Sequence, residues 1–177
     1  MDGGLDENMS KIKFKLGFNV LAFVAVLLMS YAMTQPWWMF QLEGSPVTQV
    51  YPYLIDGPGS EFIGYRRSPQ MEILTGAFAV CIVLSAAAVF LSGNLSRILL
   101  GFSGTVIILG TWRLLVRLGG VAARFEIPLQ GEGVATYGGF ANINVWTRLG
   151  LGTYLMVAGA LLVLLAAALH NQVRLGN

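Results

Sequence analysis

The chain contains one cysteine and one histidine, and this scarcity excludes several kinds of site. Cys81 alone can form no internal disulfide, and membrane thiol-redox proteins need at least a cysteine pair. It lies in an apolar stretch, so we expect a small buried hydrophobe. His170 alone cannot supply bis-histidine haem ligation or a multi-histidine metal site. We therefore expect no metal and no cofactor.

Charged side chains are also scarce, at 11% of 177 residues, whereas hydrophobic residues reach 55%. Soluble domains carry about 25% charged residues, so most of this surface faces something other than water. The net charge of +2, without a run of Lys or Arg, gives no electrostatic footprint for nucleic acid. A Gly-rich phosphate loop, a serine elbow and paired carboxylates on helix faces are missing too. We expect no catalytic residue and no enzyme, although the chain could be a non-catalytic subunit of an enzyme complex.

Long apolar stretches are what the sequence does have. A helix needs about 20 apolar residues to cross a hydrocarbon core of about 30 Å. We predict an all-α, multi-pass protein of the cell membrane, a left-handed four-transmembrane-helix bundle over 16–169, between polar tails at 1–15 and 170–177. The predicted helices are 16–34, 73–92, 98–118 and 149–169. Small residues permit close helix approach, which we expect of Gly101, Gly104, Gly152 and Gly159.

The two polar connections, 37–70 and 119–147, contain short segments rich in β-branched and aromatic residues. They predict a small β-rich cap, an antiparallel sheet on the membrane surface. Pro52 indicates an interruption or an edge strand. The expected strands are Trp38–Glu43, 47–55, Glu61–Arg66, Arg124–Leu129 and Val134–Val145.

Counting the helices places both termini and the 93–97 hairpin on one side, and the two connections on the other. The terminal side carries five Lys and Arg residues against six on the loop side, which does not decide the orientation. Lys11, Lys13 and Lys15 precede the first helix, which often dominates insertion. We therefore expect cytoplasmic termini and an extracytoplasmic cap.

Arg113 and Arg117 lie four residues apart, on one face of the third predicted helix. A cation near hydrocarbon must snorkel, pair, or line a wet cavity. One interpretation is a site for a lipid phosphate, a quinone oxygen or a partner's carboxylate. The other is a structural ion pair with Glu72 or Glu126. No acidic residue lies in the middle of a predicted span, which argues against a secondary transporter.

Aromatic residues gather near the predicted helix ends and in the first connection. An aromatic belt at the membrane interface explains the four tryptophans. Tyrosine and arginine are also enriched at interface hot spots, so a docking surface is the second interpretation. Its candidate residues are Trp37, Trp38, Tyr51, Tyr53, Phe62, Tyr65, Arg66 and Arg67.

Two residue pairs stand at landmarks of the layout: Trp37-Trp38 beyond the first helix and Arg66-Arg67 before the second. In this layout the chain resembles the claudin-type tetraspan proteins, which have a tryptophan and an arginine at these places. The resemblance is one of topology. It implies four helices, internal termini and extracellular loops that form a β-sheet. The family's Gly-Leu-Trp motif and its two loop cysteines are absent, and the nearest stretch is Phe62-Ile63-Gly64-Tyr65.

These features predict a non-catalytic accessory or structural subunit. It would dock on a larger membrane complex, or self-assemble, through its extracytoplasmic loops. The first alternative is a lipid- or quinone-binding protein that uses Arg113 and Arg117 at the membrane interface. The second is a pore-forming oligomer. The expected partners are the bilayer, other membrane subunits or further copies of the chain, and a bound lipid.

Overall fold

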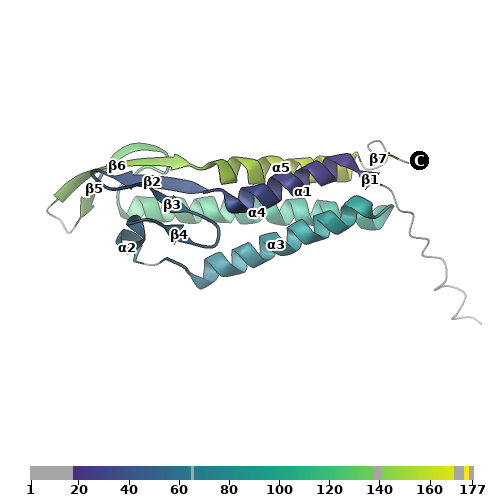
Figure 1. Cartoon of the computed structure of the whole chain (residues 1–177), viewed down its shortest axis with the longest axis horizontal. Helices are drawn as coiled ribbons and strands as arrows, with labels where there is room; N and C mark the ends of the chain where they lie inside the picture. The colour runs from purple at the N-terminus through teal and green to yellow at the C-terminus, as the bar shows by residue number, and fades with distance from the viewer. Residues whose placement is uncertain (1–17, 65, 138–140, 170–173, 176–177) are drawn as a thin grey trace, which may run out of the picture.

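A computed structural model describes residues 18–64, 66–137, 141–169 and 174–175. Helices form an elongated bundle, and a five-stranded sheet extends from one end of it (Figure 1). The long helices are α1 (Val20–Thr34), α3 (Pro69–Phe90), α4 (Asn94–Arg124) and α5 (Leu151–Ala168).

Three of these helices, α3, α4 and α5, are long and apolar enough to cross a membrane. The first helix is apolar but has only 15 residues. It begins at Val20 rather than at residue 16, because Asn19 caps it. The Asn19 side-chain oxygen accepts a hydrogen bond of 3.0 Å from the Ala22 backbone N–H, and such a cap marks a helix start.

The helices are apolar on their outer faces as well as inside the bundle. Met29, Ile107 and Met156 are fully buried, whereas Val83 and Leu109 are exposed. A helix that is apolar all round is suited to a protein core or to lipid. Exposed apolar side chains along three helices of spanning length therefore indicate a membrane-embedded protein.

Glycines allow close helix packing at two crossings inside the bundle. A Cβ on Gly159 of α5 would lie 2.5 Å from Met29 Cγ of α1. One on Gly104 of α4 would lie 2.8 Å from Leu164 Cγ of α5. Close approach is thus confirmed at both positions, but the same expectation for Gly101 is wrong, because that glycine faces open space.

Trp37 is fully buried where the bundle meets the sheet. Its indole N–H donates a 2.9 Å hydrogen bond to the Ala32 carbonyl oxygen. Its ring stacks on Phe78 of α3 at a centroid distance of 5.5 Å. A side chain on Gly152 of α5 would overlap this ring, so close approach is confirmed there too. Trp37 therefore joins three helices and belongs to neither a surface nor an aromatic belt, which corrects both expectations.

Both connections contribute to one antiparallel sheet with the strand order β4-β3-β2-β6-β5. The central pairing joins the two connections, with Trp38 opposite Leu149 and Leu42 opposite Val145. The predicted antiparallel sheet is confirmed. Its strands are β2 (Trp38–Leu42), β3 (Thr48–Val50), β4 (Ile55–Asp56), β5 (Gly131–Tyr137) and β6 (Ala141–Leu149).

Four expected strands differ in the structure. The strand expected at Glu61–Arg66 is wrong: a short helix, α2 (Gly59–Ile63), lies there. The Gly59 N–H donates a 2.8 Å hydrogen bond to the Thr48 hydroxyl, which fixes the start of this helix. Arg124–Leu129 is no strand either, because Arg124 ends α4. The segment Val134–Val145 is not one strand but parts of β5 and β6. The expected segment 47–55 divides into β3 and β4, as Pro52 indicated.

Helix α4 continues past Gly119-Gly120, where the sequence predicted its end, and reaches Arg124. Its 31 residues span about 46 Å, well beyond a hydrocarbon core of about 30 Å. Leu118 and Ala122 in the last turns are buried, and Leu118 lines a small cavity together with Trp38 and others on the sheet's inner face. Burial against the sheet offsets the cost of about 1 kcal/mol for each helical glycine.

The opposite end of the bundle holds the two ends of the described chain. There β1 (Phe18–Asn19) pairs with β7 (Arg174–Leu175). Phe18 lies 5.9 Å from the ring of Phe90, at the end of α3. The α3–α4 turn therefore lies at this end of the bundle and the sheet at the other (Figure 1).

Candidate functional site

The outer face of the sheet is the surface turned away from α4. Side chains alternate along each strand: Trp38 and Phe40 of β2 are buried, as are Val145 and Thr147 of β6. Their neighbours point outward. We define the outer face by Met39, Gln41, Glu132, Val134, Asn144, Trp146 and Arg148.

A hollow of about 430 Å³ lies on the outer face around Trp146, whose side chain is 42% exposed. Trp146 stands opposite Gln41 on one side and Glu132 on the other. Arg148 Nη2 lies 3.8 Å from Met39 Sδ. The hollow therefore combines an aromatic ring, a thioether and both signs of charge.

The loop after β3 carries two residues of the predicted docking surface, Tyr51 and Tyr53, with ring centroids 5.7 Å apart. The Tyr51 hydroxyl donates a 2.6 Å hydrogen bond to Gln49 Oε1. Burial raises the pKa of Tyr51 above its usual value, and Tyr53 and Asp56 raise it further, so the phenol stays protonated. The Thr75 hydroxyl ties the loop to α3 by donating to the Pro52 carbonyl oxygen at 2.9 Å.

Of the remaining residues of the predicted docking surface, some are buried and others are exposed. Trp38 is buried, and its indole N–H donates to the Leu129 carbonyl oxygen at 2.8 Å, so its assignment to a surface is corrected. Arg66 and Arg67 are exposed. Tyr65 and the Phe62 side chain lie outside the described residues.

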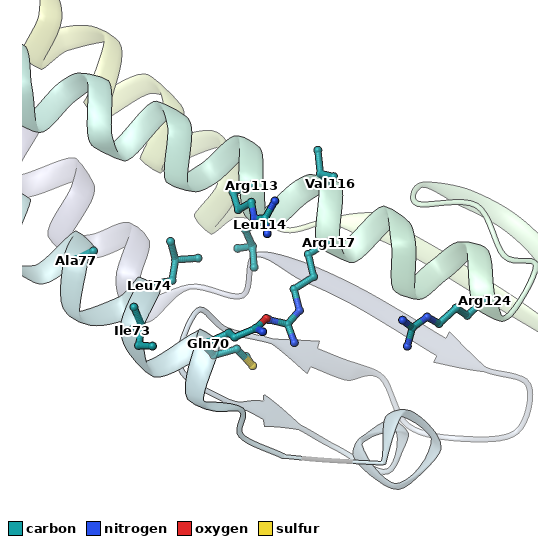
Figure 2. A pocket seen from close by; sticks show the side chains of 10 residues that line it. Gln70, Ile73, Leu74, Ala77, Arg113, Leu114, Val116, Arg117 and Arg124 are labelled. Carbon is teal, nitrogen blue, oxygen red and sulfur yellow. The ribbon is translucent and has the colours of Figure 1, made fainter.

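A second feature is the cleft between the first turns of α3 and the second half of α4 (Figure 2). It has a volume of about 650 Å³. Its walls are mainly apolar, and three arginines of α4 line it. The lining residues are Gln70, Met71, Ile73, Leu74 and Ala77 of α3 and Arg113, Leu114, Val116, Arg117 and Arg124 of α4.

The structure brings Arg113 and Arg117 together but separates them from the two predicted glutamates. Arg117 donates a hydrogen bond to Oε1 of the neutral Gln70 side chain. Glu72 and Glu126 are exposed and do not line the cleft. Within the described part of the chain, none of the cleft arginines forms an ion pair.

Sequence reasoning missed Arg124 and Gln70. Arg124 follows Arg113 by 11 residues, which is close to three helical turns, so both lie on one face of α4. The spacing was readable, but the helix was predicted to end before it. Gln70 precedes the predicted second helix, and no local pattern pointed to it.

No three His, Cys, Asp or Glu side chains among the described residues are placed to hold a metal ion. No protein-family model and no curated protein matches this chain. The resemblance to claudin-type tetraspan proteins stays a prediction from topology.

Proposed function

We propose that the protein is a non-catalytic integral membrane protein, an accessory subunit that docks on a partner membrane protein through the outer face of its sheet. In this proposal the termini are cytoplasmic and the sheet is extracytoplasmic. The hollow around Trp146 is the observation that carries it. The described part of the chain leaves this face uncovered, whereas α4 covers the other face.

The composition of the outer face supports protein contact. Trp, Tyr, Met and Arg are enriched at protein interfaces, and Lys is depleted. Trp146, Met39 and Arg148 adjoin one another across β2 and β6. The sequence contains no lysine beyond Lys15, so every cation near the sheet is an arginine. Tryptophan and arginine are both enriched at interface hot spots.

The test is extraction of the protein from native membranes in mild detergent, followed by measurement of the mass and composition of the assembly. We expect a stoichiometric complex with another membrane protein. Trp146→Ala should weaken it by about 2 kcal/mol, roughly thirtyfold in affinity, because a hot-spot side chain is removed.

Trp112→Ala is the matched control, since Trp112 is 67% exposed on α4 and does not belong to the outer face of the sheet. Docking is refuted if the wild-type protein is a clean monomer, or if both tryptophan changes weaken the assembly equally. A complex made only of this chain replaces the accessory role by self-assembly. The pore-forming alternative stays a prediction from the sequence.

A further inference from the structure

The α3–α4 cleft is an independent feature with its own chemistry. Arg113, Arg117 and Arg124 bring three positive charges to it, and none of the described residues that line it carries a carboxylate. Figure 2 shows Arg117 reaching from α4 toward Gln70 on α3, with Arg124 farther along the same helix. Charges this close to the apolar part of a membrane protein need a counter-charge or water. A bound anion would supply this counter-charge.

The other part of the cleft is apolar and open to the outside. Ile73 of α3 is 73% exposed, and Val116 of α4 is exposed as well. Leu74 and Ala77 continue this wall along α3, away from the sheet. A free anion would leave these side chains unused, whereas a neutral quinone would leave three charges without a partner. A molecule with an anionic head and an apolar tail matches both parts.

The position of the cleft suits such a molecule. The first turns of α3 lie at the sheet end of the bundle, where apolar helix surface gives way to the sheet (Figure 1). With a bilayer around the apolar part of the bundle, lipid phosphates would lie at this level, just outside the hydrocarbon. Arginine binds phosphate through paired N–H groups, and its flat guanidinium matches the phosphate oxygens.

We propose that the α3–α4 cleft binds an anionic phospholipid, with its phosphate held by Arg117 and its negative charge further balanced by Arg113 and Arg124 along α4. An acyl chain lies along Ile73, Leu74 and Val116. The hydrogen bond to Gln70 holds the Arg117 side chain in the position from which it contacts the phosphate. The site does not depend on whether the sheet docks on a partner.

The experiment uses the full-length protein, stripped of lipid in detergent and reconstituted in nanodiscs of phosphatidylcholine with a minor share of phosphatidylglycerol. Native mass spectrometry then counts the phosphatidylglycerol molecules that remain bound to the protein after it has been released from the nanodisc. We expect wild type to retain one. The triple change Arg113→Gln, Arg117→Gln and Arg124→Gln should reduce its retention at least about tenfold, because charged hydrogen bonds to phosphate are lost.

The matched control is Arg66→Gln, Arg67→Gln and Arg148→Gln, which removes the same charge from exposed positions outside the cleft. It should retain lipid as wild type does. Replacing the three cleft arginines with lysine keeps the charge but removes the paired N–H groups, and should give an intermediate loss. Ala77→Phe fills the apolar wall without changing charge and should also reduce retention. Thermal unfolding in detergent identifies variants that do not fold.

Several results overturn the proposal. Wild type could retain no phosphatidylglycerol, or both triple variants could lose it equally, which indicates general surface charge. If inorganic phosphate alone displaces the lipid completely, or Ala77→Phe has no effect, the site takes a free anion without a tail. If a photo-crosslinker at Ile73 captures a polypeptide rather than lipid, the occupant is a protein.

Discussion

At the residue scale, the junction between α1, the sheet and α5 depends on backbone contacts that only glycine permits. The Gly150 N–H donates to the Trp37 carbonyl oxygen at 2.9 Å, and the Gly152 N–H donates to the Pro36 carbonyl oxygen at 3.0 Å. The Thr153 hydroxyl adds a 2.8 Å hydrogen bond to the Trp37 carbonyl oxygen. A tryptophan that looks like a membrane-interface anchor in the sequence is therefore a core residue.

Gly150→Ala should strongly destabilise the protein. A Cβ at this position would overlap the Pro36 carbonyl oxygen, and backbone cannot move aside as a flexible side chain can. We expect a loss of about 1–3 kcal/mol or more in the free energy of unfolding. Thermal unfolding in detergent measures it. Gly76→Ala is the control, because a Cβ there meets nothing within 4 Å. Equal unfolding midpoints for wild type and Gly150→Ala would contradict the packing described here.

At the element scale, the sequence predicted what periodicity and hydropathy determine, and missed what distant contacts determine. Apolar runs located the four bundle helices with their ends displaced by no more than about four residues, except for the end of α4. The hydropathy of these runs could not show that Leu118 of α4 lies against the inner face of the sheet. Local propensity could not place the helix α2 at Gly59–Ile63 either, because its start depends on a hydrogen bond to Thr48 of strand β3.

The sequence predicted only some of the residues of the candidate site, for the same physical reason. Arg113 and Arg117 stood out because they are charges beside an apolar run. Arg124 did not, because Gly119-Gly120 suggested a helix end before it. The outer face of the sheet was also missed. Residues 134–145 were read as a single strand, so the pairing of β6 with β2 could not be inferred.

Substitutions at Gly119 and Gly120 test whether α4 continues to Arg124, as in the structure, or ends at residue 118, as the sequence predicted. In the structure both glycines are helical, and a Cβ on either meets nothing within 4 Å. Each change to alanine should therefore raise the free energy of unfolding by about 0.5–1 kcal/mol. If the helix ended at residue 118 with a left-handed glycine, alanine would destabilise it instead. Chemical unfolding in detergent gives the sign.

At the scale of the whole molecule, the chain has two kinds of surface. The bundle presents apolar side chains suited to lipid, whereas the sheet presents a mixed polar and aromatic face at one end. Strands β1 and β7, the ends of the described chain, and the α3–α4 turn lie at the other end. The proposed topology, with a bilayer around the bundle, therefore predicts that the sheet and the α3–α4 turn lie in different aqueous compartments, whichever way the protein is inserted.

Cysteine labelling tests this separation and the proposed orientation together. The single native cysteine, Cys81, is buried, so Cys81→Ala provides a background without thiols. Gln130→Cys lies beside the sheet, Asn94→Cys lies at the opposite end, and both positions are exposed. In intact cells, a maleimide that cannot cross membranes should label residue 130 and leave residue 94 unlabelled. In permeabilised cells, the maleimide should label both residues. Labelling of residue 94 alone reverses the orientation. Labelling of both in intact cells contradicts a membrane around the bundle, since thiols at its two ends would then share one aqueous compartment.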